Sequence, residues 1–354
     1  PTMASVSLDR HWLVIHQPGS ANIFQIVDLT NPKAAISTFA LPQDTFTPAE
    51  GAHGYEAIEW ASDNTNLLLK HTYTGGSEYL IFNRDAIANS VNLTKVFAAQ
   101  PFTSVSLRDK KPDQLYLHNN SNGSLFQAST TNRTATLLQS GVISYKSYQE
   151  DTVVYASAGS VPTETNVRVR RGDQDYLVRT IPQASNYLLD MAEFKGQLYL
   201  VAGSPADGRV YIFKDPFAYL GRRPSRQPEA FRVLVQPDAQ YLSFSAIARF
   251  VAVQAGSKFA IYDLETNRQF KYDTGLSLVP GLKASWMDGH RLSLVSDSNI
   301  QVFDFDGSNM QKLQTSHSAF PPFFDRDYKA VYSLAPNGER TNLLRTELVV
   351  GANP

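Results

Sequence analysis

The feature that most constrains this chain is a repeated pattern of four short runs of alternating apolar residues. Its clearest copy spans residues 282–318, where each run is 5–8 residues long and ends at Gly, Asp, Asn or Ser. Such runs are typical of β-strands, and those turn residues tolerate tight or left-handed backbone. About 37 residues therefore predict a four-stranded antiparallel meander, which cannot bury both of its faces unless it packs against further copies.

The same pattern recurs along the whole chain, with eight copies over 354 residues and a period near 44 residues. This period matches the 40–50-residue spacing of four-stranded propeller blades. We therefore predict an all-β chain that forms a single β-propeller domain over residues 1–354, with eight blades favoured and seven as the alternative. The expected blades are residues 1–41, 54–97, 102–140, 142–182, 186–236, 238–276, 281–318 and 319–350.

Details of the repeat refine this prediction. The second run of most copies is the most continuously apolar, as expected for a strand buried on both faces between neighbouring blades. In the second copy we expect residues 91–97 to form the fourth strand. The last copy has three clear strands, and the N-terminal residues could supply the missing one and remove an open edge. Two β-sandwiches in tandem are the alternative architecture, but the even spacing argues against a boundary between them.

Composition and charge exclude several classes of protein. The formal net charge is −1 with acids and bases interspersed, which argues against a nucleic-acid binder. The chain has no cysteine, so disulfides, thiolate metal sites and a cysteine nucleophile are excluded. No run approaches the roughly 18 apolar residues of a membrane span. The chain begins Pro-Thr-Met, and we interpret it as a trimmed part of a longer protein whose N-terminal segment carries targeting information.

Two stretches support a family resemblance. Residues 59–71 read EWASDNTNLLLKH and residues 285–295 read SWMDGHRLSLV, with Trp60 and Trp286 opening the motif and Asp63, Asp288 and Gly289 at its turn. Both stretches resemble the W-[SA]-P-D-G-x-x-[IL] repeat of TolB-type propellers, although neither has the proline. The chain is also similar, more loosely, to propeller regions that follow a PEGA-type module in some bacterial surface proteins. WD-repeat scaffolds are a weaker match. The resemblances imply an extracytoplasmic, partner-binding role rather than catalysis.

Aromatic residues dominate the positions that lead into the first strands. In a propeller, the loop into each first strand and the loop between the second and third strands lie on one face, here called the leading face, which commonly binds ligands. Large, rigid, amphipathic side chains there suit a protein or glycan partner. Packing between blades is the alternative role for each of them. The candidate binding residues are His53, Tyr55, Phe102, Tyr145, Tyr187, Tyr241 and Phe323.

An irregular insertion at residues 215–230 carries Arg222, Arg223 and Arg226. We expect it between the third and fourth strands of its blade, opposite the leading face, as either a docking loop for an acidic partner or a solvated loop. The stretch Arg168–Arg171 alternates charged and apolar side chains and is expected to be the exposed face of a strand.

Other potential sites favour structural interpretations. None of the seven histidines has helical metal-ligand spacing, and neutral packing or surface histidine is the default for each. Residues 304–309 resemble a calcium loop but lack its closing acid, so a turn is favoured. Residues 323–327 place two carboxylates around Arg326, which an ion pair explains as well as acid/base chemistry. We predict no metal, no cofactor and no catalytic residues.

These observations lead to a ranked set of functions. We favour a non-enzymatic β-propeller interaction module in a bacterial cell envelope. It would bind a protein or glycan, would be a monomer, and would reach a membrane only through a segment missing from this chain. A cytoplasmic location stays open. A glycosidase-like or lactonase-like propeller hydrolase or lyase with a site in the central channel is the alternative, and a self-associating surface-layer component is a third possibility.

Overall fold

The computed structural model describes residues 3–31, 36–223, 226–338 and 340–348. Eight antiparallel sheets follow one another in chain order, and they are the blades of an all-β propeller fold. The predicted fold class and the preference for eight blades over seven are confirmed. The chain divides into two compact units: unit 1 comprises residues 1–140 and 323–354, and unit 2 comprises residues 141–322. That residues 1–354 act as a single domain stays a prediction.

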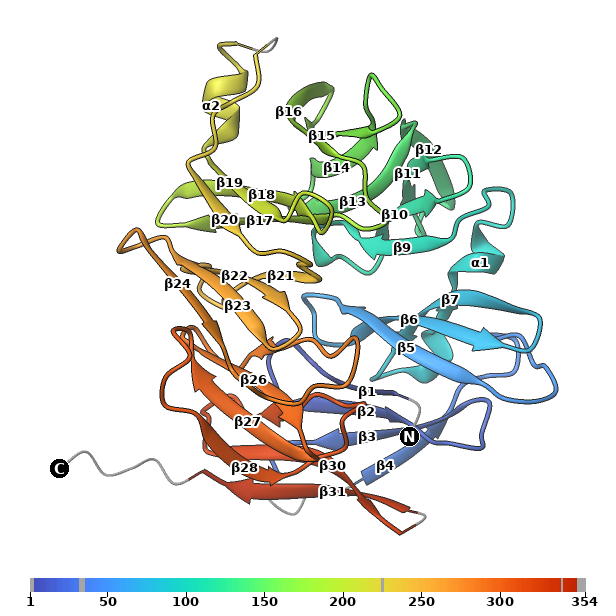
Figure 1. Cartoon of the computed structure of the whole chain (residues 1–354). Coiled ribbons are helices and arrows are strands. Elements are labelled where there is room, and N and C mark those ends of the chain that lie inside the picture. The colour runs from blue at the N-terminus through green and yellow to red at the C-terminus, as the bar shows by residue number, and fades with distance from the viewer. Residues whose placement is uncertain (1–2, 32–35, 224–225, 339, 349–354) are drawn as a thin grey trace. The chain divides into compact units, whose positions relative to one another are not determined.

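Unit 1 contains four of the sheets, with strand orders β1-β2-β3-β4, β5-β6-β7-β8, β9-β10-β11-β12 and β29-β30-β31 (Figure 1). Its elements are β1 (Met3–Val6), β2 (Trp12–His16), β3 (Ile23–Asp28), β4 (Ile36–Ala40), β5 (Gly54–Trp60), β6 (Asn66–Tyr73), β7 (Gly76–Asn83), the 3-10 helix η1 (Ile87–Asn89), β8 (Val91–Asn92), α1 (Leu93–Val96), β9 (Ser104–Leu107), the 3-10 helix η2 (Arg108–Lys110), β10 (Gln114–Asn119), β11 (Ser124–Ser129), β12 (Thr134–Gln139), β29 (Phe323–Phe324), β30 (Ala330–Asn337) and β31 (Arg340–Glu347).

Unit 2 contains the other four sheets, each with four strands in sequential order. Its elements are β13 (Val142–Tyr148), β14 (Thr152–Ala158), β15 (Glu164–Arg171), β16 (Gln174–Pro182), β17 (Leu188–Phe194), β18 (Gln197–Ser204), β19 (Arg209–Lys214), α2 (Pro216–Leu220), β20 (Arg232–Val235), β21 (Tyr241–Phe244), β22 (Phe250–Ala255), β23 (Lys258–Asp263), β24 (Arg268–Asp273), β25 (Ser285–Trp286), β26 (Arg291–Ser296), β27 (Asn299–Asp304) and β28 (Gln311–Thr315).

The core of each unit lies between consecutive blades. In β6 the second-strand residues Leu67, Leu68 and Leu69 are all fully buried. Leu67 and Leu69 pack toward the first blade, whereas Leu68 packs toward the third, because successive side chains on a strand point to opposite faces. Burying a leucine side chain contributes about 1.5–3 kcal/mol, so each second strand stabilises two blade contacts at once. The predicted double burial of second strands is confirmed.

The two tryptophans of the repeat motif join neighbouring blades. The indole Nε1 of Trp60 donates a hydrogen bond to Ser5 Oγ at 2.9 Å, and Nε1 of Trp286 donates to Ser243 Oγ at 3.0 Å. In both cases the serine lies on the first strand of the preceding blade. Each tryptophan therefore bridges the innermost strands of two consecutive blades within its unit.

The acidic residue of each motif copy shapes the turn that follows. Asp63 accepts hydrogen bonds from the backbone N–H groups of Thr65 and Asn66. Asp288 accepts the equivalent bonds from His290 and Arg291. This local pairing satisfies the turn backbone, which is the usual reason for an Asp at such a position.

The second blade departs from the prediction at its fourth strand. Only Val91 and Asn92 form β8, and the chain then turns into α1 instead of continuing as a strand to residue 97. Asn92 caps this helix, because its side chain accepts a hydrogen bond from the backbone N–H of Lys95. The alternating pattern of residues 91–97 was therefore misleading, since a side-chain cap outweighs a weak strand pattern.

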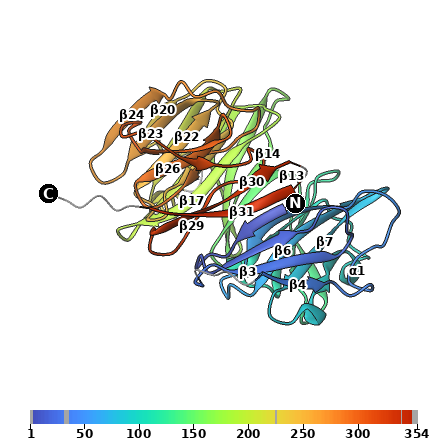
Figure 2. The ribbon, with the colours of Figure 1, turned by 90° about the horizontal axis from the view of Figure 1, so that it is seen from below.

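The suggestion that N-terminal residues complete the last blade is wrong. Met3–Val6 pairs with β2 inside the first blade, and the described part of the eighth blade has three strands. Side chains instead join these two sheets of unit 1. Strands β3, β4, β30 and β31 of the two sheets are labelled in Figure 2. The buried hydroxyl of Tyr332 donates to the carbonyl oxygen of Leu29 at 2.9 Å, and the Arg10 guanidinium lies 4.6 Å from the ring centroid of Tyr328.

Some predicted positions lie outside the described residues. These are residues 1–2 and 32–35 of the first blade, Pro224 and Ser225 of the insertion, and residues 339 and 349–350 of the last blade.

Candidate functional site

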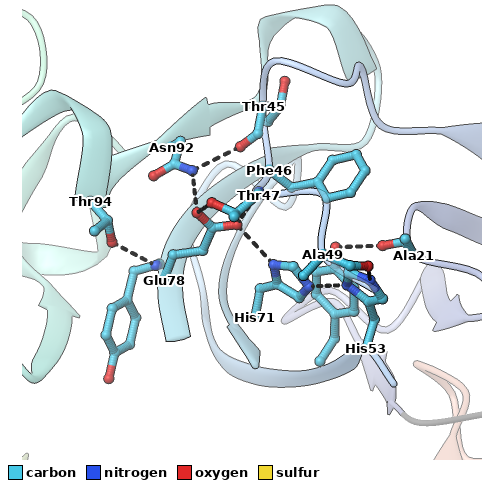
Figure 3. Close-up of polar contacts among 12 residues, drawn as sticks. Ala21, Thr45, Phe46, Thr47, Ala49, His53, His71, Glu78, Asn92 and Thr94 are labelled. Atoms are coloured by element: carbon cyan, nitrogen blue, oxygen red, sulfur yellow. Dashed lines mark hydrogen bonds and ion pairs between the residues drawn. The ribbon is translucent and has the colours of Figure 1, made fainter. Parts of the chain in front are cut away.

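The leading face of unit 1 gathers two histidines, a glutamate and a tyrosine beneath the loop of residues 41–53, which leads into β5 (Figure 3). Tyr55 in β5 pairs with His71 in β6, and His71 pairs with Glu78 in β7. The tight turn between β6 and β7 fixes this register. Side chains directly opposite on antiparallel strands share a face of the sheet, so these three lie in a row.

Glu78 is the buried end of this row, with 2% of its surface exposed. One carboxylate oxygen accepts from His71 Nδ1 at 2.8 Å and from the Thr47 backbone N–H at 2.6 Å. The other accepts from Thr47 Oγ1 at 2.8 Å and from Asn92 Nδ2 at 2.7 Å. Burial alone raises the pKa of a carboxyl group, but these hydrogen bonds outweigh it and lower the pKa of Glu78 to about 2. Glu78 is therefore ionised at neutral pH.

His71 links Glu78 to His53, and His53 links to the loop backbone. His71 Nε2 lies 2.8 Å from His53 Nδ1, and His53 Nε2 lies 2.9 Å from the carbonyl oxygen of Ala49. The planes of the two imidazole rings differ by 9° and their centroids are 5.1 Å apart, so the N···N contact runs edge to edge in the ring planes.

Counting hydrogens along this chain fixes its charge. The Glu78 carboxylate and the Ala49 carbonyl oxygen can only accept, so the outer nitrogen of each imidazole carries a hydrogen. The contact between the two rings needs one hydrogen more. Three hydrogens on four ring nitrogens give the His53–His71 pair one positive charge, which balances the negative charge of Glu78.

Aromatic rings keep water from this charge. The Tyr55 ring stacks on His71 with centroids 4.5 Å apart and planes 12° apart, and Phe46 meets His71 edge-on at 6.0 Å. Tyr55 is buried, and its hydroxyl donates to the carbonyl oxygen of Ala21 at 2.8 Å. Burial raises the pKa of Tyr55, so the hydroxyl stays protonated. Hydrogen bonds are stronger in such a low-dielectric setting.

His16 is a third buried imidazole in this cluster. Its ring lies 4.4 Å from Tyr55 and 5.1 Å from Phe24, centroid to centroid, and none of its surface is exposed. Burial lowers the pKa of His16 to about 4, with the nearby His71 and His53 contributing in the same direction. His16 is therefore neutral at neutral pH.

These contacts fasten loop 41–53 to the second blade. The carbonyl oxygen of Thr45 accepts from Asn92 Nδ2 at 3.0 Å, and that of Asp44 accepts from Lys95 Nζ at 2.7 Å. Thr47 and Ala49 are held by Glu78 and His53 as described. Gly51 has φ of 101°, and a Cβ there would come within 2.7 Å of Thr74 Oγ1. The Glu78–His71–His53 chain thus ends on the loop itself and fixes the loop conformation.

Of the predicted binding residues, the structure brings His53 and Tyr55 together in this cluster. His71, Glu78 and His16 were not singled out from the sequence as site residues. The Thr-Gly-Gly turn at residues 74–76 was a usable signal, because counting back from it places His71 opposite Glu78.

The other predicted binding residues lie elsewhere. Tyr187 and Phe323 are buried, which supports a packing role for these two. Tyr187 Oη forms a hydrogen bond with Thr165 Oγ1 at 2.7 Å. Phe102, Tyr145 and Tyr241 are half-buried. The Tyr241 hydroxyl donates to the carbonyl oxygen of Gly281 at 2.5 Å. Partner binding by these residues stays a prediction.

The insertion lies where it was expected, between β19 and β20. Arg222, Arg223 and Arg226 are all exposed, and the segment begins with the short helix α2. Phe217 of this helix packs under the Arg171 guanidinium, 3.9 Å from the ring centroid. Exposure leaves both interpretations of the insertion open, and the docking role stays a prediction.

The remaining candidate motifs serve as turns or strands. Asp304 accepts from Asn309 Nδ2 at 2.6 Å, and Asp325 accepts the backbone N–H groups of Lys329 and Ala330. Both carboxylates therefore close turns. Residues 168–171 lie in β15 as predicted, but their three arginines are half-buried rather than exposed and Val169 is buried. Arg168 forms an ion pair with Asp175 at 2.9 Å.

Two features are absent from the described ranges. No group of three or more His, Cys, Asp or Glu side chains is arranged to hold a metal ion there. No helix within these ranges has the length and apolar character needed to cross a membrane.

Comparisons with known proteins support the fold. No family model matches the chain, and no curated protein matches it either. Among solved structures, Hsv2p of Kluyveromyces lactis is similar with a TM-score of 0.54 and 12% identity, covering 90% of this chain and 99% of that one. An oligogalacturonate lyase in complex with manganese is similar with a TM-score of 0.52 and 9% identity, covering 98% and 99%. At such identities the likeness shows the β-propeller fold alone.

Proposed function

We propose that this β-propeller is a non-enzymatic interaction module whose protein or glycan partner contacts loop 41–53 on the leading face of unit 1. The observation that supports this proposal is the Glu78–His71–His53 chain, which ends on the Ala49 carbonyl oxygen. A loop of this length is ordinarily mobile, and ordering it on binding weakens affinity. A loop already fastened by buried charges is pre-organised for a partner.

The exposed side of the loop indicates the chemistry of the contact. Gln43, Asp44, Pro48 and Glu50 are largely exposed, whereas Thr45 and Phe46 are buried beneath them. The two carboxylates favour a partner that presents hydrogen-bond donors or positive charge to the loop. Fixed loops on a rigid scaffold are the usual location of recognition residues.

Photo-crosslinking tests this proposal. A benzophenone side chain at position 50 should capture one partner in the native host, and a benzophenone at position 85 should not. Asp85 is a matched control because it is an exposed acid, with 56% of its side chain accessible, beyond the opposite end of β7. Equal capture from both positions, or from neither, would contradict the proposal.

A second candidate, a propeller hydrolase or lyase, is favoured by one feature, the hydrogen bond between the ionised Glu78 and His71. A carboxylate that orients an imidazole is a common general-base arrangement. The contact between His53 Nε2 and the carbonyl oxygen of Ala49 argues against a hydrolase or lyase, because it occupies the outer nitrogen of the histidine pair. Assays of the purified protein with oligogalacturonate, neutral oligosaccharides and lactones separate the two functions. Turnover that disappears in His71→Asn would overturn the non-enzymatic proposal.

We further propose that the protein works in a bacterial cell envelope, outside the cytoplasm. The complete lack of cysteine in 354 residues supports this, because such a chain avoids oxidative mispairing. The resemblance to TolB-type propellers points in the same direction. Fractionation of the native host tests this location, and recovery with cytoplasmic markers would contradict it.

A further inference from the structure

Loop 41–53 is fastened in two parts, and the contacts of its first part involve no histidine. Glu78 accepts two hydrogen bonds from Thr47, one from the backbone N–H and one from the hydroxyl. Asn92 and Lys95 donate to carbonyl oxygens of the loop at 3.0 Å and 2.7 Å. A carboxylate, an amide and an ammonium group make these contacts, so residues 44–47 stay in place whatever the charge of the histidine pair.

The second part of the loop, residues 48–52, is tied to the second blade through His53. Its Nε2 contacts the carbonyl oxygen of Ala49 at 2.9 Å, and its Nδ1 contacts Nε2 of His71 at 2.8 Å. These contacts and the one from His71 to Glu78 need three ring hydrogens, one more than two neutral imidazoles carry. A single extra proton therefore connects this part of the loop to Glu78.

Loss of that proton breaks the connection at one of two places. His71 keeps its hydrogen on Nδ1, which faces Glu78, so its Nε2 can only accept. His53 then has one hydrogen for two acceptors, His71 Nε2 and the Ala49 carbonyl oxygen. Whichever contact it keeps, the other sets two unshared electron pairs against each other. Residues 48–52 therefore lose their link to Glu78.

Other titratable groups surround the pair and its loop. They are Glu78 from β7, Tyr55 from β5, Tyr73 from β6, His16 from β2, Lys95 from α1, and the exposed Asp44 and Glu50 on the loop. The pKa of Glu78 is about 2 and that of His16 about 4, whereas burial raises the pKa of Tyr55. Tyrosine and lysine ordinarily titrate near pH 10, and exposed acids near pH 4. The range between about pH 7 and 9 is therefore left to the histidine pair.

We propose that the proton shared by His53 and His71 is a pH-dependent switch, which fastens residues 48–52 while it is present and releases them when it leaves at alkaline pH. Residues 44–47 remain in place in both states. Glu50 lies in the released part and Asp44 in the fixed part. A partner of the loop should bind less tightly after release, because binding must then order residues 48–52. This effect on a partner rests on the proposed function, whereas the release itself does not.

Nitroxide labels test the release without any partner. Because the chain has no cysteine, Glu50→Cys and Asp44→Cys each provide one attachment site, and both replace an exposed acid of the loop. Between about pH 7 and 9 the rotational correlation time of the label at position 50 should fall several-fold, while that at position 44 should not change. The imidazole ¹⁵N shifts of His53 and His71 should change with the same midpoint. No change at position 50, or an equal change at both positions, would overturn the proposal.

Histidine variants assign the transition to the pair. In His53→Leu the label at position 50 should be mobile already at neutral pH and should show no further change, because no proton is shared. His290→Leu is the control, since His290 is an exposed histidine of unit 2, and it should keep the transition. A transition that persists in His53→Leu would overturn the assignment.

The switch and the proposed function fail in different ways. Capture of a partner by the benzophenone at position 50, together with a label there that does not respond to pH, would reject the switch and keep the proposed function. A label that responds as expected, without capture of a partner, would reject the proposed function and keep the switch.

Discussion

His71 Nδ1 donates to Glu78 across 2.8 Å, and this contact between two almost fully buried side chains anchors loop 41–53. The two residues lie directly opposite on β6 and β7. Their pairing couples the charge of the glutamate to the shared proton of His53 and His71. A change at Glu78 therefore reaches the loop directly through Thr47 and also through His71 and His53.

Glu78→Gln should lower the free energy of unfolding by about 3 kcal/mol. The amide cannot accept all four hydrogen bonds, and it leaves the positive charge of the histidine pair without its balancing carboxylate. Urea unfolding followed by tryptophan fluorescence measures this, since Trp12 and Trp60 lie in the adjoining core cluster of unit 1. Glu56→Gln is the control, because Glu56 is exposed on β5 and should change the free energy by less than about 0.5 kcal/mol.

Stability should fall in acid in two stages. The pKa of His16 is about 4 in the folded protein against an ordinary 6.5, so folding favours its neutral form. That stabilisation is complete above pH 6.5 and is lost as the pH falls toward 4, a change of roughly 3 kcal/mol. The pKa of Glu78 is about 2 against an ordinary 4.5, so its contribution is lost between pH 4.5 and 2.

His16→Leu separates the two stages. The leucine has no proton to gain, so the free energy of unfolding should fall less between pH 6.5 and 4.5 than in the unmodified protein, while the lower stage persists. Urea unfolding at intervals across this range provides the measurement. An unchanged slope in the variant would show that other groups cause the upper stage.

The blade pattern could be predicted from the sequence because its causes are local. The alternation of apolar residues and the turn residues between runs are both properties of neighbouring positions, and they identified eight meanders. The short α1 was missed because its cause, the side-chain cap of Asn92, competes with an alternating pattern that is equally local. The prediction that N-terminal residues add a strand to the last blade was wrong. The last and first blades are joined by a side-chain contact, from Tyr332 to Leu29, rather than by strand pairing.

The candidate site could be predicted only in part. His53 and Tyr55 follow from their position before a first strand, and the His71–Glu78 pair follows from the register of a Gly-Gly turn. The contact from His53 to His71 depends on the path of a long loop, which no local pattern determines. The burial of the Gln236 side-chain oxygen likewise depends on how the loop around it folds, which no local sequence pattern determines.

A double-mutant cycle tests the bridge between inner strands in unit 2. Trp286→Phe and Ser243→Ala each remove the 3.0 Å hydrogen bond, and together they should cost about 1 kcal/mol less than the sum of the separate changes. The free energies come from urea unfolding of the four proteins. Additive losses would mean that the indole acts through packing alone. The cycle Trp60→Phe with Ser5→Ala should give a similar coupling in unit 1, since its hydrogen bond measures 2.9 Å.

Tyr332→Phe should weaken the junction between the eighth and first blades of unit 1. The change removes a buried hydroxyl that donates to the Leu29 carbonyl oxygen and accepts from Arg345 Nε at 3.3 Å. We expect a loss of about 1–2 kcal/mol and faster hydrogen exchange at the backbone amides of β30, because no strand pairing supports this junction within the described residues. Tyr219→Phe, a half-buried tyrosine of α2 in unit 2, is the control and should leave exchange in β30 unchanged. If exchange in β30 stays slow in Tyr332→Phe, the packing of the two sheets, rather than this hydrogen bond, holds the junction.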